Sequence, residues 1–121
     1  MVRQIVSAIQ SLDRKLIGVR DGRTSVVDWR DVLYLESVDK RCFIYTADQV
    51  LETPLTLREV EERFDGTGLF RCSKSQIVNL LHLTSLRPEF GSRLELVMKN
   101  SERLIVSRKY AKPLKERLGV I

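Results

Sequence analysis

Short apolar runs, separated by turn-forming residues, make up most of the chain after residue 14. Asp21-Gly22 separates the first two runs, and this pair is a strong signal for a two-residue β-hairpin turn. Further turns are expected at 39–41, Asp48-Gln49, Gly91-Ser92 and Asn100-Ser101. The pattern predicts a mainly β, antiparallel domain. Its expected strands are 15–20, 23–28, 32–38, 42–46, 50–53, 83–90, 93–98 and 103–107.

One short helix is expected in the middle of the chain. Thr56 and Glu59 have the spacing of a capping box, in which the threonine hydroxyl accepts from the Glu59 amide and the carboxylate accepts from the Thr56 amide. Val60 and Phe64 would lie on its buried side. Gly66 would end this helix, because glycine adopts the left-handed conformation of a helix C-terminus without strain.

Helical patterns are also present near both ends of the chain. Ile5, Ile9 and Leu12 stand at helical spacing, so residues 1–14 are predicted to form a helical lead-in to a single domain over 15–121. A C-terminal helix is expected to begin near Lys109, after a candidate N-cap at Ser107. Pro113 would then lie in the first turn of that helix or bend it, since proline lacks an amide hydrogen.

The length and composition are those of a small globular domain. The chain has 121 residues, of which 43% are hydrophobic and 31% charged. Neither an apolar run of about 18 residues nor the order of a signal peptide is present, which predicts a soluble, cytoplasmic protein. Cys42 and Cys72 lack metal-site spacing and are expected to be free thiols in a reducing compartment, with a redox pair as the alternative.

The basic charge is concentrated in the second half of the chain. The net charge is +5; residues 1–70 carry 10 Lys and Arg against 12 Asp and Glu, whereas residues 71–121 carry 11 against 4. Such asymmetry favours a polyanionic partner, because cations that neutralise phosphates release condensed counterions. A solvated basic face that keeps the protein in solution is an equal alternative on charge alone.

No constellation of catalytic residues is recognisable. The single histidine, His82, lies in the apolar segment NLLHL and is interpreted as structural, and Ser73 and Ser75 lack the surroundings of an activated serine nucleophile. Phosphate-binding, dinucleotide-binding and metalloprotease motifs are absent from the sequence. We therefore expect no enzyme activity, no cofactor, no metal and no small-molecule substrate.

Three polar segments combine cations with small hydroxyl side chains. They are Lys40-Arg41 in an expected hairpin turn, the stretch 71–75 (RCSKS) in an expected loop, and 107–109 (SRK) before the last helix. Lys and Arg can donate to guanine in the major groove, while serine hydroxyls and loop amides donate to phosphates. Exposed turns are usually polar, but three such segments in one small β domain favour a binding surface.

An ordered set of motifs resembles the LytTR-type DNA-binding domain of bacterial transcription regulators. The segments LYLESVDKRCFIYT, LFRCSKSQIVNLLHLTSL and VSRKY carry the resemblance, which runs from about Val32 to Leu118. The most specific block runs from Phe70 to Asn79 and is followed at the family's distance by Ser107-Arg108.

The resemblance implies an elongated, mainly β fold with one short middle helix and a C-terminal helix, which inserts loops into the major groove of duplex DNA without a recognition helix. It therefore implies a sequence-specific transcription regulator. Arg71 and Asn79 would do more to shape their loop than to touch DNA. The implied DNA-binding residues are Lys40, Arg41, Cys42, Arg71, Ser73, Lys74, Ser75, Asn79, Arg108 and Lys109.

The chain differs from many family members in ways that bear on partners. Histidine often stands at the position of Ser73 or near Cys42, so the base preference here should differ. Family domains often follow a phosphate-accepting receiver domain as the output domain of a response regulator, and no receiver fits in this chain. The resemblance is greatest to small stand-alone members, with an excised domain as the alternative. It also implies pairs of protomers on direct-repeat sites and a membrane-bound regulatory partner.

Two other functions are compatible with the residues. A β-rich protein-interaction module could use the basic face to bind an acidic or membrane-associated partner, and salt-dependent duplex binding with sequence preference would separate it from the DNA-binding hypothesis. A thiol-based sensor would require Cys42 and Cys72 to approach within disulfide range, with Cα atoms under about 7 Å apart.

Overall fold

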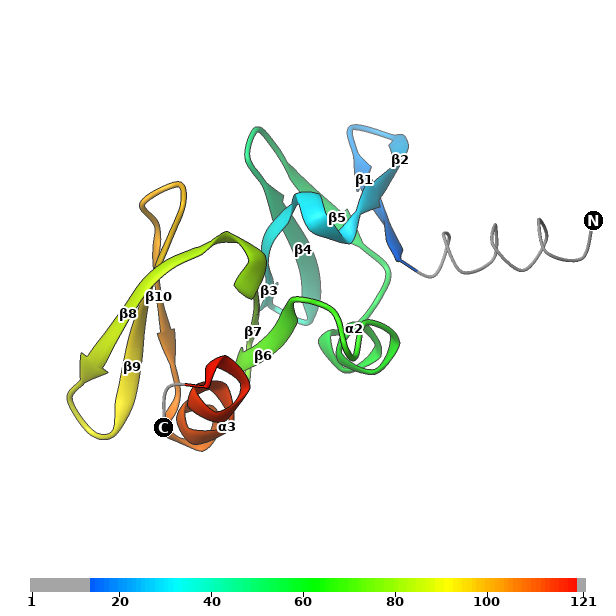
Figure 1. The fold of residues 1–121 in the computed structure, drawn as a ribbon. Helices are drawn as coiled ribbons and strands as arrows, with labels where there is room; N and C mark the ends of the chain where they lie inside the picture. The colour runs from blue at the N-terminus through cyan, green and yellow to red at the C-terminus, as the bar shows by residue number, and fades with distance from the viewer. Residues whose placement is uncertain (1–13, 120–121) are drawn as a thin grey trace, which may run out of the picture.

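The computed structural model describes residues 14–119 and consists of two antiparallel sheets, two α-helices and two 3₁₀ turns (Figure 1). The helical lead-in expected near the N-terminus lies outside these residues. The strands are β1 (Lys15–Arg20), β2 (Arg23–Asp28), β3 (Val32–Val38), β4 (Arg41–Thr46), β5 (Val50–Thr53), β6 (Leu69–Ser73), β7 (Gln76–Asn79), β8 (Leu83–Glu89), β9 (Arg93–Met98) and β10 (Arg103–Val106). The helices are η1 (Trp29–Asp31), α2 (Leu57–Arg63), η2 (Leu80–His82) and α3 (Arg108–Leu118).

The first sheet has seven strands in the order β2-β1-β5-β4-β3-β7-β6, and the second has three in the order β10-β9-β8. Two hydrophobic cores lie on opposite faces of β3, β7 and β6. One core is closed by α2, and the other by α3 and the second sheet (Figure 1). Among the described residues, no helix is both long and apolar enough to cross a bilayer.

The continuous apolar run at the start of β3 follows from this two-sided burial. Val32 and Leu35 pack in the core with α2, whereas Leu33 and Tyr34 pack in the core with α3. The register of β3 against β4 shifts between Val32 and Tyr34, so the local departure from strict alternation is a strand irregularity. A strand covered on both faces needs apolar residues at successive positions, since neither face is solvated.

Antiparallel pairing of β3 with β7 places two turns at the same end of the first sheet. Glu36 pairs with Gln76, and the Ser37 amide donates to the Ser75 carbonyl over 2.8 Å. The β3–β4 turn therefore lies beside the β6–β7 turn. A further bond from the Ser107 amide to the Cys72 carbonyl (2.9 Å) fixes the start of α3 to β6.

Most expected elements are confirmed. The antiparallel strands, the capping box at Thr56 and the C-terminal helix all occur. The middle helix ends earlier than expected, at Arg63 with Phe64 as its C-cap, and Gly66 adopts its positive φ of 85° two residues later. Mainly β architecture with a middle and a C-terminal helix was the expected fold class. These features depend on local periodicity and turn chemistry, which the sequence expresses directly.

Several expected boundaries were wrong. Arg41 is the first residue of β4, paired with Val38, so the turn comprises residues 39–40. Residues 71–73 belong to β6, because β7 supplies hydrogen-bonding partners that polar residues can use as well as apolar ones. Ser107 is the N-cap of α3 but its side chain makes no capping bond, and Pro113 lies in the second turn of that helix.

The side chain of Asn79 joins three segments inside the fold. Its amide nitrogen donates to the carbonyls of Trp29 (2.9 Å) and Val32 (2.8 Å), and its oxygen accepts from the Leu81 amide (3.0 Å). The residue has no exposed surface. A Cβ atom at position 68 would come within 2.5 Å of the Asn79 side-chain oxygen, so only glycine allows the main chain to pass this close.

We expect Asn79→Ala to lower the free energy of unfolding by about 2–4 kcal/mol, because it leaves main-chain groups next to a buried side chain without their partner. Urea unfolding monitored by Trp29 fluorescence would measure the change. Asn100→Ala is the matched control, since this exposed asparagine accepts one local bond from the Glu102 amide and its loss should cost less than about 1 kcal/mol. Equal losses for the two variants would contradict the structural role of Asn79.

Candidate nucleic-acid interface

The β3–β4 turn presents Lys40 in a conformation that lysine rarely adopts. Asp39 and Lys40 have φ values of 51° and 65°, as the two central residues of a type I′ hairpin turn require, and both are exposed. Glycine or asparagine is favoured at such positions, and other residues cost about 1–2 kcal/mol. Lys40 therefore occupies this position at a cost in stability, which makes it a candidate functional residue.

Arg41 is held by an acidic partner on the neighbouring strand. Its guanidinium donates to both carboxylate oxygens of Glu52, with Nη2–Oε1 at 2.6 Å and Nε–Oε2 at 3.1 Å. The hydrogen bond from Arg41 lowers the pKa of Glu52. Arg41 also lies over the ring of Phe43. Its side chain does not project freely from the turn, whereas the Lys40 side chain makes no ion pair with another described residue.

The β6–β7 turn is shaped by Arg71. The guanidinium donates to the carbonyls of Ser73 (Nε–O 2.7 Å) and Lys74 (Nη2–O 2.6 Å), and it contacts Glu61 of α2 at 3.3 Å. Only 16% of the Arg71 side chain is exposed. Arg71 thus satisfies the carbonyls on the protein side of the turn, and the side chains of Lys74 and Ser75 on the other side are exposed to solvent.

Ser73 contributes to the same turn through its hydroxyl, which accepts from the Ser75 amide at 3.3 Å. It is half-buried, so one part of its surface remains open to a ligand. Lys74 and Ser75 are the exposed residues at the tip, which gives this turn one cation and one hydroxyl for external contacts.

An open hollow of about 550 Å³ lies between these two turns and the start of α2. Five cations and one carboxylate, Glu52, line it. Three of these cations are ion-paired with Glu52, Glu61 and Glu62, so the net positive charge comes from Lys40 and Lys74. A polyanion would meet an attractive field here that is only partly screened at physiological salt. The cations are Lys40, Arg41, Arg58, Arg71 and Lys74.

The third segment begins α3 and lies beside β6. Arg108 and Lys109 are its first two residues and both are exposed. The Lys109 ammonium lies 5.4 Å from the centre of the Tyr110 ring. The bond from the Ser107 amide to Cys72 holds this segment next to the second turn, so all three predicted segments are attached to neighbouring strands.

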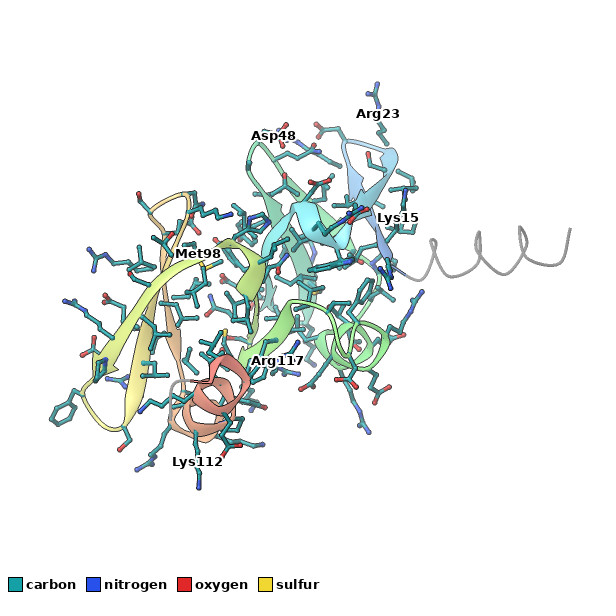
Figure 2. The ribbon with its side chains drawn as sticks, in the orientation of Figure 1. Lys15, Arg23, Asp48, Met98, Lys112 and Arg117 are labelled. Atoms are coloured by element: carbon teal, nitrogen blue, oxygen red, sulfur yellow. The ribbon has the colours of Figure 1, made fainter. Side chains whose placement is uncertain are left out.

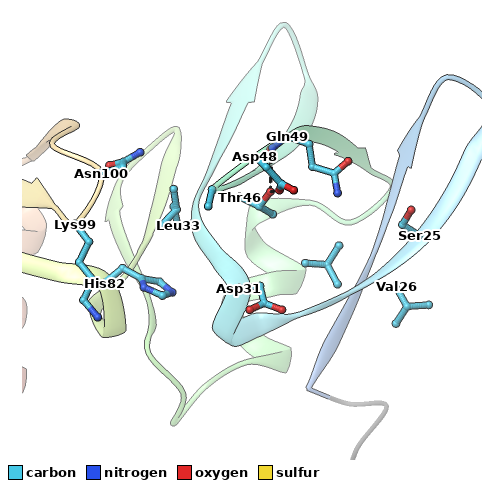
Figure 3. Close-up of a pocket in the computed structure, with 12 residues that line it drawn as sticks. Ser25, Val26, Asp31, Leu33, Thr46, Asp48, Gln49, His82, Lys99 and Asn100 are labelled. Carbon is cyan, nitrogen blue, oxygen red and sulfur yellow. Dashed lines mark hydrogen bonds between the residues drawn. The ribbon is translucent and has the colours of Figure 1, made fainter.

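The opposite end of the molecule has a different charge character. A hollow of about 750 Å³ between the β4–β5 turn, η2 and the β9–β10 turn is lined by Asp31 and Asp48 as well as Lys99 (Figure 3). His82 also lines it, and its Nε2 is hydrogen-bonded to the Arg30 carbonyl, as expected for a structural histidine. Figure 2 shows Asp48 and Arg23 at this end, away from α3.

The sequence-predicted residues thus divide into two groups. The exposed ones are Lys40, Lys74, Ser75, Arg108 and Lys109, with Ser73 half-buried and Arg41 paired. Asn79 is fully buried and Cys42 nearly so, so their side chains offer almost no surface for contact. Glu52, Arg58 and Glu61 were missed, because they approach these turns only through strand and helix packing; the capping box near Arg58 was the one local signal.

The two cysteines are buried, unpaired and far apart. Cys42 lies in β4 and Cys72 in β6, with β3 and β7 between them. Three strand spacings amount to roughly 14 Å, well beyond the reach of a disulfide. Burial raises the pKa of the Cys42 thiol to about 11 and that of Cys72 to about 12, so neither is a reactive thiolate at neutral pH.

Residues 22–119 match the family model described as LytTr DNA-binding domain. A Staphylococcus aureus (strain NCTC 8325) protein, named as an uncharacterized HTH-type transcriptional regulator, is 29% identical over 98% of this chain and 82% of its own length. The sensory transduction protein LytT of Bacillus anthracis is 33% identical over 78% of this chain, and the match spans 39% of LytT.

A solved structure shares the fold. It is the LytTr DNA-binding domain of a Bacillus cereus protein described as a methyl-accepting/DNA response regulator, with a TM-score of 0.82 and 28% identity over 88% of this chain and 97% of that one. Between residues 14 and 119, α2 and α3 are separated by five strands. This part of the chain therefore contains no helix-turn-helix, whatever the name of the staphylococcal relative.

We expect both thiols to resist alkylation by iodoacetamide at pH 8 in the folded protein. A folded pKa of about 11 or 12, against about 8.5 for a free thiol, lowers the thiolate fraction by roughly two orders of magnitude or more. Mass spectrometry would compare the folded chain with the same chain in urea, where both cysteines should react quickly. The rate for the folded chain should rise with pH up to 10. Rapid modification of either cysteine at pH 8 without urea would contradict their burial.

Proposed function

Because this chain belongs to the LytTr DNA-binding domain family, we propose that it is a sequence-specific transcription regulator that binds duplex DNA with three segments at one end of its sheets. The segments are the β3–β4 turn, the β6–β7 turn and the start of α3. The observation that carries the proposal is their convergence: the Ser37–Ser75 and Ser107–Cys72 main-chain bonds attach them to adjacent strands, and each presents an exposed cation.

The cations differ in the contacts they suit. Arg108 is exposed at the start of a helix and can donate two parallel bonds to guanine O6 and N7 in the major groove. Lys40 and Lys74, at the tips of rigid turns, can serve as point charges for phosphates or bases. The exposed positions of these turns support their insertion into the major groove. Binding data that resolve individual base pairs would test it.

The remaining family-implied residues have supporting roles. Arg71 positions the second turn through its bonds to the Ser73 and Lys74 carbonyls, whereas Asn79 holds the other end of β7 against η1 and β3. Arg41 would bind a phosphate only after breaking its ion pair with Glu52. The Glu52 carboxylate would therefore limit non-specific binding to DNA. Cys42 packs behind the first turn and affects it through volume.

A protein-interaction module remains the second candidate, because an excess of exposed cations also attracts acidic proteins and anionic surfaces. The regulator proposal further includes two protomers on direct repeats, a membrane-bound regulatory partner, and action in the cytoplasm, where the chromosome lies. The first experiment must therefore separate sequence-dependent DNA binding from general attraction to polyanions.

Selection of duplexes from a random library by the purified chain should enrich one short motif, bound with steep salt dependence. Arg108→Ala should then weaken binding by about 1–3 kcal/mol and relax preference at one base pair. Arg23→Ala is the matched control, because this exposed arginine lies in the β1–β2 hairpin at the other end of the molecule. Fluorescence anisotropy across a salt series would measure both. Failure to enrich any motif, with equal binding to all duplexes and to heparin, would favour the interaction module.

Lys40→Gly should change stability and DNA binding in opposite directions. Glycine relieves the positive φ of the turn, so unfolding should cost about 0.5–1 kcal/mol more. Loss of the ammonium should weaken DNA binding and reduce the salt slope by about one unit. Urea unfolding and anisotropy would be measured on the same preparations.

Ser101→Gly provides the control for this pair of effects. Ser101 has a φ of 70° in the β9–β10 turn, at the end of the molecule opposite the proposed surface. It should show a gain of stability of similar size with unchanged DNA affinity. If Lys40→Gly bound DNA as tightly as the unsubstituted chain, the first turn would not be part of the surface.

A further inference from the structure

The tip of the β8–β9 hairpin carries an aromatic side chain that the fold does not use. Phe90 is 85% exposed, more than any other large hydrophobic residue in the described part of the chain. Glu89 pairs with Arg93, so residues 90–92 form the connection, and the positive φ values fall on Gly91 and Ser92. Neither turn geometry nor core packing therefore requires a phenyl ring at position 90.

The surroundings of Phe90 are cationic. An open hollow of about 560 Å³ lies between the hairpin tip and the start of α3, and its lining contains Arg93, Arg108 and Lys109 but no carboxylate. The hollow is thus continuous with the third proposed DNA-binding segment. Figure 1 shows the β8–β9 tip and α3 at the same end of the molecule, opposite the β4–β5 and β9–β10 turns.

Local hydrogen bonds hold the charge in place beside the ring. The Nε of Arg93 donates to the Phe90 carbonyl at 2.9 Å, which fixes the guanidinium at the tip and leaves its terminal nitrogens for external contacts. The nearby Glu89 carboxylate accepts from the Phe90 amide at 3.0 Å, so it is engaged with the main chain. Arg87 and Arg103 share the single carboxylate of Glu95, so this group of three side chains keeps one net positive charge.

We propose that the β8–β9 tip is a fourth DNA-contacting segment, in which Arg93 binds a phosphate and Phe90 packs against the adjacent deoxyribose. This inference rests on the proposed function and extends the footprint on the side of Arg108. Deoxyribose-phosphate offers an apolar sugar face next to an anionic oxygen, which matches a phenyl ring beside a guanidinium. Contacts of this type add affinity without reading sequence.

The test uses the selected duplex in two lengths. The base pair read by Arg108 identifies the nearer end, and trimming the duplex at that end removes the backbone that the tip would contact. On the long duplex, Phe90→Ala should raise Kd about tenfold, the size expected for exposing one buried phenyl ring. Arg93→Gln should reduce the salt slope by about one unit. On the trimmed duplex, the unsubstituted chain should lose both contacts and bind as weakly as either variant binds that same duplex.

Val26→Ala is the matched control, because Val26 is 58% exposed on β2 and should affect neither duplex. Unchanged binding of Phe90→Ala to the long duplex would overturn the inference, as would an equal loss on both duplexes. A loss confined to cooperative binding on a direct repeat would overturn it too, because the ring would then contact a second copy of the chain. In each of these cases Arg108→Ala would still lose affinity, whereas failure of the proposed function would abolish specific binding by the unsubstituted chain.

Discussion

Antiparallel pairing of β3 with β7 is the constraint on which the candidate surface depends. It joins two hairpins that are far apart in the sequence and places their turns, at 39–40 and 74–75, side by side. The Ser37–Ser75 bond ends this pairing at the surface, and the two cores press on β3 and β7 from both faces. A slip of one residue would exchange the residues of the two cores, so the register is strongly specified and the turns cannot drift relative to each other.

The polar residues near the surface perform two separable tasks. Arg71 donates to two carbonyls of the second turn, which makes this turn rigid, and Asn79 donates to Trp29 and Val32 at the other end of β7. Lys40, Lys74 and Arg108 have exposed side chains that contribute little to the fold. A rigid turn would lose less conformational entropy on binding, so Arg71 would support the contacts proposed for Lys40, Lys74 and Arg108.

The two ends of the folded molecule differ in charge, and this difference does not follow the division of the sequence into two halves. The hollow beside the first two turns combines cations from residues 40–74, and the hollow beside α3 combines Arg93 with Arg108 and Lys109. At the opposite end, Asp31 and Asp48 accompany Lys99. Arg41 illustrates why a count of cations is insufficient, because its charge is already matched by Glu52. Charge complementarity between a protein surface and its partner affects the rate of encounter and the specificity more than the affinity.

Local patterns in the sequence determined the elements and the candidate segments. Hairpin turns, strand alternation and the capping box at Thr56 depend on residues within a few positions of each other, so they could be predicted before any contact was known. The cations of the expected turn at Lys40-Arg41, the motif around the second turn and Ser107-Arg108 likewise located the three segments. The strand boundaries at Arg41 and 71–73 were missed, because polar residues enter a ladder when a neighbouring strand supplies partners.

Only the tertiary structure decided which side chains of those segments are exposed. Asn79 bonds across 50 residues to Trp29, Arg41 is held by Glu52, and Cys42 and Cys72 are buried in separate cores. The position of Phe90 near Arg108 also depends on the tertiary structure, because it requires the second sheet to pack beside α3. Burial and long-range pairing depend on contacts between strands that are far apart in the sequence. The order of residues within one strand does not specify those contacts.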